Sequence, residues 1–135
     1  MTPEQVQRWL DAYLEAWKSY DRASIEALFS TDVRYRYHPY DDPIVGRDAV
    51  VESWLAEAAF EEASERDAPG TYDGSYHPVA VDGDVAVAVG ASTYTDGPGG
   101  PVKDVYHNCW LLRFAPDGRC REFTEWYMKQ PGTRE

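Results

Sequence analysis

Four polar side chains with proton chemistry stand among aromatic and apolar residues of this sequence: Tyr13, His38, Asn108 and Glu125. A phenol with an ordinary pKa of about 10 donates hydrogen bonds at neutral pH, and an imidazole with a pKa of about 6.5 both gives and takes protons there. A buried carboxylate acts as an acid or a base. Together these types suit general acid/base catalysis.

Side chains alternate between the two faces of a strand, so the last two expected strands predict which residues share a face with Asn108 and with Glu125. Asn108 shares its face with Trp110, and Glu125 shares its face with Phe123 and Tyr127. An amide among aromatic residues needs a partner, so Asn108 is expected to bond a ligand, Glu125 or the local backbone. Glu125 is either a buried carboxylate fit for acid or base work or a solvent-facing strand residue.

The run RYRYHP at 34–39 places His38 at the end of another expected strand. If Tyr35 and Tyr37 point inward, His38 belongs to the outward set with the two arginines, unless Pro39 breaks the alternation. We therefore expect Tyr37, ahead of His38, to line the interior.

The first 62 residues predict three helices that would position these groups. A helix is expected over 3–19, because Thr2, Pro3 and Glu4 form a start signal and the apolar residues that follow recur at spacings of three and four. A second helix begins after Asp21 and continues through Phe29. A third begins at residue 48 and ends near residue 62 or soon after. The apolar stripes of the three helices contain Trp9, Tyr13, Trp17, Ile25, Leu28, Val50, Val51 and Trp54.

The second half of the chain changes to the period of strands. Four strands are expected over 76–81, 85–94, 102–114 and 120–128, after a first strand that begins at Val33. Pro39 and Pro43 are expected to prevent regular pairing between that first strand and the third helix. Helices followed by a meander predict an α+β fold, with the helices covering one face of a curved, mostly antiparallel sheet.

Composition and charge narrow the class of protein. The chain has 135 residues, which fits one domain over 1–135. Its net charge of −11 disfavours nucleic acid and anionic membrane surfaces as partners. It has neither an apolar run long enough for a bilayer nor the features of a signal peptide, so a cytoplasmic location is the expectation.

The cysteines and histidines do not suggest a metal or redox site. If Phe114 pairs with Arg119 across the PDG turn, Cys109 and Cys120 lie about 14 Å apart along the hairpin, so both are expected to be free. The three histidines, at 38, 77 and 107, lack metal-ligand spacing, and no nucleotide or serine-hydrolase motif occurs. No cofactor is expected.

Four segments in this order carry a resemblance to a known family: VQRWLDAYLEAW, DRASIEALFSTDVRYRYHP, GRDAVVESW and YHNCWLLRFAPDGRCREFTEWY. The chain resembles the nuclear transport factor 2-like superfamily, in its SnoaL-like and ketosteroid-isomerase-like branch. The resemblance implies a cone-shaped barrel, with three N-terminal helices packed in the concave face of a strongly curved sheet and a deep apolar pocket. It also implies a homodimer.

The resemblance implies roles for particular residues. Tyr13 occupies the position of an oxyanion donor, although it also fits a purely structural aromatic stripe. His38 stands where the isomerases carry a general-base Asp, and Trp110 stands where they carry a second oxyanion donor. Glu125 lies near the catalytic Asp of related epoxide hydrolases, but the strand over 85–91 lacks the Asp and Arg partners which those enzymes need.

Two functions follow as expectations. The first is a cofactor-free isomerase, cyclase or dehydratase that acts on a small apolar or aromatic, ring-containing molecule. The second is a non-catalytic ligand-binding or protein-interaction dimer. The expected catalytic residues are Tyr13, His38 and Glu125, with a pocket lined by Trp17, Tyr37, Trp54, Tyr76, Asn108 and Trp110.

Overall fold

The computed structural model describes residues 1–61, 72–95 and 100–131. In this part of the chain three helices pack on a six-stranded mixed sheet of order β2-β1-β6-β5-β4-β3, in which only β1 and β6 are parallel neighbours. The elements are α1 (Pro3–Ser19), α2 (Arg22–Glu26), β1 (Phe29–Arg36), β2 (Ile44–Val45), α3 (Arg47–Glu61), β3 (Tyr72–Asp82), β4 (Val85–Thr95), β5 (Val102–Phe114) and β6 (Cys120–Lys129).

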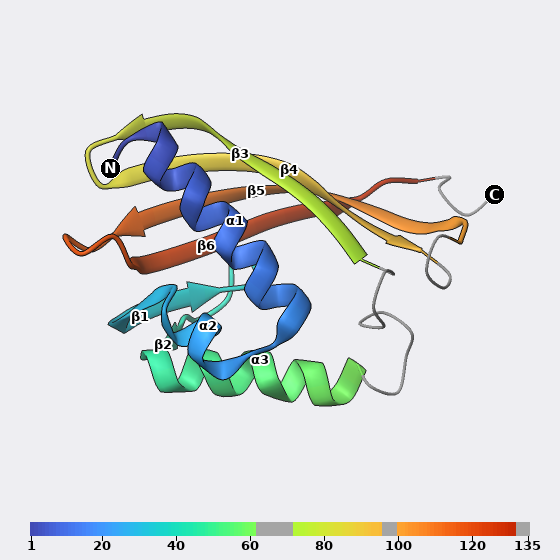
Figure 1. Cartoon of the computed structure of the whole chain (residues 1–135), viewed down its shortest axis with the longest axis horizontal. Helices are drawn as coiled ribbons and strands as arrows, with labels where there is room; N and C mark the ends of the chain where they lie inside the picture. The colour runs from blue at the N-terminus through green and yellow to red at the C-terminus, as the bar shows by residue number, and fades with distance from the viewer. Residues whose placement is uncertain (62–71, 96–99, 132–135) are drawn as a thin grey trace.

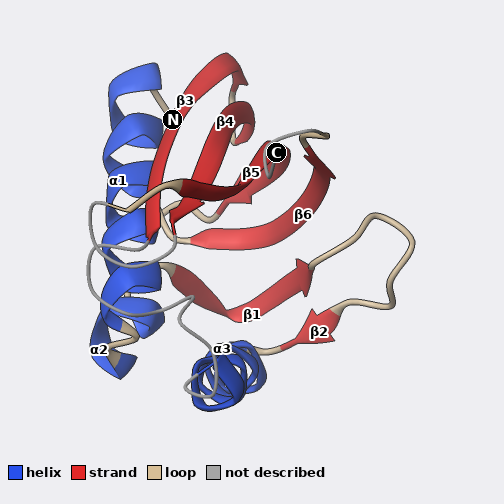
Figure 2. Ribbon diagram, turned by 90° about the vertical axis from the view of Figure 1, so that its right-hand side faces the viewer, coloured by secondary structure: helices blue, strands red, loops and turns tan. Residues whose placement is uncertain are grey.

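The sheet curves around the helices without closing. Helix α1 crosses the long strands β3–β6, and α3 lies under β1 and β2 (Figure 1). Seen from the side, the helices and the bent sheet enclose a common interior (Figure 2). The α+β fold with helices on one face is therefore confirmed, but the sheet is open at β2 and β3 and does not form a complete barrel.

The predicted bounds of helix α1 are confirmed. They were predictable because both ends of the helix carry strong local signals. Thr2 and Gln5 form a capping box, in which the Thr2 hydroxyl accepts the Gln5 backbone N–H and the Gln5 side chain accepts the Thr2 N–H. Pro3 occupies the first helical position. At the other end Tyr20 adopts a left-handed conformation with φ of 52° and donates its N–H to Ala16, which ends the helix.

The second helix is shorter than predicted, and β1 begins earlier. Helix α2 ends at Glu26, whereas Phe29 is already paired with Cys120 in the sheet. The Cys120 N–H donates to the Leu28 carbonyl. Leu28 and Phe29 are buried in the observed strand just as they would be in a helix, so apolar periodicity could not separate the two structures.

Pro39 and Pro43 were expected to prevent strand pairing between β1 and α3. This expectation is wrong at β2, which pairs with β1. Pro43 directly precedes β2, whose Ile44 pairs with Tyr35 of β1. The turn into α3 needs Gly46, which has φ of 97° and donates its N–H to Val33. A two-residue strand is too short to show a period, so the sequence contained no signal for it.

Strand β3 also exceeds its prediction, because it extends over Tyr72–Asp82 and includes a proline. Pro78 is accommodated at a register shift against β4, between Pro78 and Ala80. The β5–β6 hairpin differs from the predicted register by one residue at Phe114, which pairs with Cys120 and not with Arg119. Beyond the register shift at Arg113 the difference is two residues, because Cys109 pairs with Trp126 and not with Thr124. Both cysteines are free, and Cys109 lies opposite Trp126.

The core is dominated by large aromatic side chains that α1, β1, α3, β5 and β6 contribute. Burial of each such side chain stabilises the fold by about 1.5–3 kcal/mol relative to exposure. Many of their rings meet edge-to-face, a geometry that aromatic pairs prefer, and the rings of Tyr35 and Phe123 stack with centroids 4.4 Å apart. The largest fully buried members are Trp54, Trp110, Tyr35, Phe29, Phe114 and Phe123.

Candidate functional site

The inward face of β5 and β6 holds a hydrogen-bonded group centred on the Glu125 carboxylate. Asn108 Nδ2 donates to Glu125 Oε2 at 2.7 Å, and Trp110 Nε1 donates to the same oxygen at 3.1 Å. Asn108 Nδ2 also donates to Tyr76 Oη at 2.7 Å. One carboxylate oxygen is thus fixed by two N–H donors, and Asn108 and Glu125 meet as one of the alternatives predicted from alternation.

Strand register explains why these side chains converge. Trp110 lies directly opposite Glu125 across β5 and β6, so both side chains project from the same face at close range. Tyr76 reaches the group from β3, where it lies opposite Gly90 of β4. A Cβ at Gly90 would stand 2.4 Å from the Tyr76 ring, so the glycine provides the space in which that ring stacks on Trp110.

The polar group has a hydrogen-bond partner at its Tyr76 end, but one acceptor at its Asn108 end lacks a partner among the described residues. The Tyr76 hydroxyl shares a 2.8 Å hydrogen bond with the Ser92 hydroxyl, deep in the structure. Asn108 Oδ1 is buried and has no hydrogen-bond partner among the described residues. Both Asn108 N–H bonds are directed to Tyr76 and Glu125, so the atom that remains is an acceptor.

Tyr13 lies next to this group but bonds elsewhere. Its hydroxyl makes a 2.9 Å hydrogen bond with the hydroxyl of Tyr35, and its ring packs 4.6 Å from that of Trp110. Burial, followed by the proximity of Tyr35 and Glu125, raises the pKa of Tyr13 well above its usual value. The phenol is therefore neutral at physiological pH.

Three residues predicted to line a pocket lie in or against the aromatic core. The Trp54 ring packs 5.0 Å from both Trp17 and Tyr13, and all three side chains are buried. Trp54 Nε1 has no hydrogen-bond partner among the described residues. Tyr37 is partly buried against the core, and its hydroxyl shares a 2.9 Å hydrogen bond with that of Ser53 on α3.

His38 does not join the Asn108–Glu125 group. It follows β1, where Nδ1 lies 2.9 Å from Asp41 Oδ2 and Nε2 lies 3.2 Å from Tyr127 Oη. Its ring stacks on Tyr40. The His38 side chain is 34% exposed, so it forms part of the surface at the end of β6.

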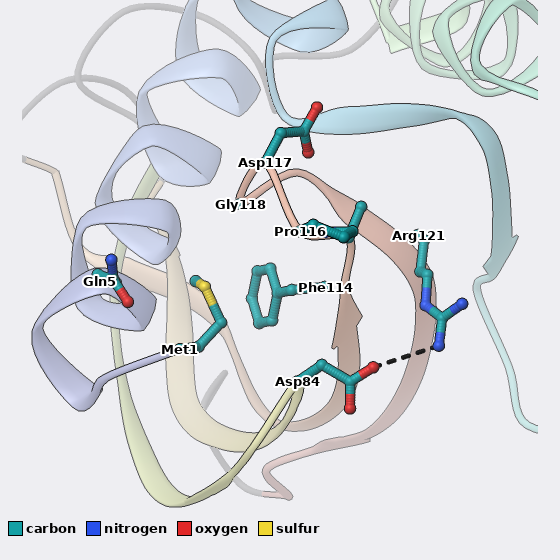
Figure 3. Close-up of a pocket in the computed structure, with 9 residues that line it drawn as sticks. Met1, Gln5, Asp84, Phe114, Pro116, Asp117, Gly118 and Arg121 are labelled. Atoms are coloured by element: carbon teal, nitrogen blue, oxygen red, sulfur yellow. Dashed lines mark hydrogen bonds and ion pairs between the residues drawn. The ribbon is translucent and has the colours of Figure 1, made fainter.

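A cavity of about 520 Å³ lies at the other end of β6, beside Arg121 (Figure 3). The start of α1 and the two hairpin turns surround it, and an ion pair of 3.2 Å between Asp84 and Arg121 crosses its side. None of the predicted site residues lines this cavity. Its lining consists of Met1, Gln5, Asp84, Phe114, Ala115, Pro116, Asp117, Gly118 and Arg121.

The family model of the SnoaL-like domain matches residues 10–123. The chain belongs to the SnoaL-like domain family. A comparison of the sequence of this SnoaL-like protein with curated proteins finds no match.

Solved structures share the fold of this SnoaL-like protein at low sequence identity. The "putative ketosteroid isomerase" from Kribbella flavida DSM 17836 is 19% identical with a TM-score of 0.64, over 95% of this chain and 81% of that one. An LEH-like epoxide hydrolase of M. tuberculosis is 15% identical with a TM-score of 0.62, over 93% and 84%. SalBIII, an epoxide hydrolase/cyclase-like enzyme in pyran ring formation in the polyether salinomycin, is 16% identical with a TM-score of 0.65, over 95% of both chains.

Two polar partners in this SnoaL-like protein escaped sequence reasoning. Asp41 lies in an irregular loop, where no periodicity indicates its direction. Ser92 lies on a strand of small residues, and its only available signal was a polar side chain on the inward face opposite Tyr106. Within residues 1–61, 72–95 and 100–131 no three metal-binding side chains cluster. No helix in those ranges has the length and hydropathy to cross a bilayer.

Proposed function

We propose that this SnoaL-like protein is a cofactor-free enzyme that uses Glu125 as a general base on a small, largely apolar, ring-containing molecule. The observation that carries the proposal is the fixed Glu125 carboxylate, whose Oε2 accepts from both Asn108 and Trp110. Removal of a proton next to a carbonyl is the first step of isomerisation through an enol, and the same step initiates base-catalysed cyclisation and dehydration.

The two donors support a role as base because they orient the carboxylate in advance. Hydrogen bonds from N–H groups favour the ionised carboxylate, which is the form that accepts a proton. Orientation before the substrate arrives removes part of the entropic barrier to reaction. The aromatic side chains of Tyr76 and Trp110, stacked with ring centroids 4.1 Å apart, exclude water from one side of the group.

The unpartnered Asn108 Oδ1 supports a ligand that donates a hydrogen bond. A buried acceptor without a donor costs about 1–3 kcal/mol, and a hydroxyl or N–H group of a ligand would recover that free energy. The ligand class is therefore a ring-containing molecule with at least one such donor. The same aromatic surroundings favour rings over extended chains.

The proposal is tested by isotope exchange. Cyclic ketones and β-hydroxy ketones are incubated in D₂O with the protein, and NMR measures the loss of the C–H signal next to the carbonyl. We expect the wild type to accelerate exchange for a member of the panel, and Glu125→Gln to abolish the acceleration. Glu122→Gln is the matched control, since Glu122 lies on the same strand and bonds Arg113 at 3.0 Å.

The second candidate function is a protein-interaction dimer, and one surface favours it. Trp126 and Met128 alternate with Glu125 and Tyr127 on β6, so they project from the opposite face of the sheet. Their exposed fractions are 44% and 76%, which is high for large apolar side chains. We propose that this outer face joins two copies of the chain, whether or not the inner face is catalytic.

A further inference from the structure

A second polar group stands beside the proposed base, at the ends of β1 and β6. It consists of Asp41, His38 and Tyr127, which are connected by hydrogen bonds of 2.9 Å and 3.2 Å through the two nitrogens of the imidazole. A carboxylate only accepts hydrogen bonds, so His38 Nδ1 carries a proton directed to Asp41. Nε2 is thereby left to exchange a proton with the hydroxyl of Tyr127.

The sheet brings Tyr127 next to the proposed base. Tyr127 lies directly opposite Asn108, whose side chain bonds Glu125. Glu125 and Tyr127 are two residues apart on the same face of β6, a separation of about 7 Å along the strand.

The environment of Tyr127 suits a proton donor that a substrate can reach. Its exposed fraction is 46%, in contrast to the buried Tyr13. Burial of part of the ring, followed by the proximity of Tyr40 and Glu125, raises the pKa of Tyr127, so the phenol keeps its proton at neutral pH. Its ring also packs edge-on against Tyr106 at 5.9 Å, which restricts its position.

We propose that Tyr127 is the proton donor that works with Glu125, and that His38 and Asp41 are positioning residues for it. This inference rests on the proposed function of Glu125. Glu125 removes a proton from the carbon beside a substrate carbonyl, the C–H electron pair forms the enol double bond, and the carbonyl oxygen takes the proton of Tyr127 Oη. When Glu125 returns the proton to the carbon, the enol oxygen gives its proton back to the Tyr127 phenolate, while His38, whose Nδ1–H is donated to Asp41, holds the Tyr127 hydroxyl in place.

The relay is tested with Tyr127→Phe, His38→Gln and Asp41→Asn on the compound that the exchange panel identifies. We expect kcat to fall about 100-fold in Tyr127→Phe and about tenfold in the other two variants, with KM changed less than about threefold. Because His38 acts through Tyr127, the double variant should be no slower than Tyr127→Phe alone. His77→Gln, at an exposed histidine on β3, is the control and should match the wild type.

The outcomes separate the two proposals. If Glu125→Gln loses exchange while Tyr127→Phe keeps kcat within about threefold, the relay is wrong and the base is retained. If no compound exchanges, the relay is tested by ¹⁵N NMR of the His38 ring in the protein without a ligand. The relay then requires an Nε2 signal that shifts in Tyr127→Phe and an Nδ1–H that is lost in Asp41→Asn, and unchanged signals overturn it.

Discussion

Asn108 connects both halves of the candidate site, because its amide group donates to Tyr76 on one side and to Glu125 on the other. Alternation along β5 and β6 predicted which residues share a face with Asn108 and with Glu125, but it left open whether Glu125 faces the interior or the solvent. The pairing across the two strands follows from antiparallel register. The Asp41–His38–Tyr127 group was not predictable, because it depends on the direction of a loop after Pro39. Loop direction is set by tertiary contacts that no sequence period reports.

Replacing Asn108 by leucine should destabilise the protein and impair the site together. Tyr76 Oη and Glu125 Oε2 each lose a donor in a partly buried environment, so we expect the free energy of unfolding to fall by about 1–3 kcal/mol. Urea denaturation measures this change. Arg119→Leu, in the exposed turn between β5 and β6, is the control and should change it by less than about 0.5 kcal/mol.

The buried thiol of Cys120 leads us to expect that the free energy of unfolding depends on pH. Burial raises the pKa of its thiol from 9.0 to about 12, whereas the unfolded chain has a thiol of ordinary pKa. The full stability is therefore present below about pH 9, and between there and about pH 12 only the unfolded chain loses the proton. The free energy of unfolding should fall by about 1.4 kcal/mol for each pH unit in that window.

Urea denaturation of wild type and Cys120→Ala between about pH 8.5 and about pH 10 isolates this contribution. The alanine variant should be less stable at neutral pH because it leaves a cavity, yet its stability should decline less steeply with pH. Equal slopes in the two proteins would show that the buried thiol does not contribute.

At the scale of the elements, local signals determined which boundaries were predictable. The bounds of α1 follow from a capping box and a left-handed cap, both of which involve only neighbouring residues. The boundary between α2 and β1 was mispredicted, because Leu28 and Phe29 are buried by long-range contacts whichever element contains them. The parallel pairing of β1 with β6 joins distant segments, and no local pattern specifies it.

Gly90 provides a test of how β3 and β4 support the site. A Cβ there would stand 2.2 Å from the Ser75 carbonyl oxygen and 2.4 Å from the Tyr76 ring. Gly90→Ala should therefore displace Tyr76 from Trp110 and lower the free energy of unfolding by about 1–3 kcal/mol. Thermal unfolding and the NMR ring-current shifts of Tyr76 measure the two effects.

The neighbouring Ala91→Val is the control for Gly90→Ala. Its side chain projects from the opposite face of β4, so the added methyl groups do not approach Tyr76. A Gly90→Ala variant with the stability and Tyr76 shifts of the wild type would contradict the role assigned to this glycine.

At the scale of the whole molecule, the outer face of the sheet predicts association. If Trp126 and Met128 lie at the interface between two copies, light scattering should give twice the chain mass of 15.3 kDa for the wild type. The double substitution Trp126→Glu and Met128→Glu should give the single mass, because buried unpaired charges are costly.

Val45→Glu is the matched control for association, since Val45 is also exposed but lies on β2. It should keep the mass of the wild type. If the wild type had the mass of one chain, the proposed dimer would be contradicted. The proposal for Glu125 on the inner face would not be affected.

The most direct test of the account is the rate of deuterium exchange by Glu125→Gln relative to wild type, on the compound that the wild type turns over. The Glu125 carboxylate is proposed to take the proton, so the ratio should be about 0.01 or lower. Glu122→Gln should remain within about threefold of the wild type. A folded Glu125→Gln protein that exchanges as fast as the Glu122→Gln control would contradict the central claim.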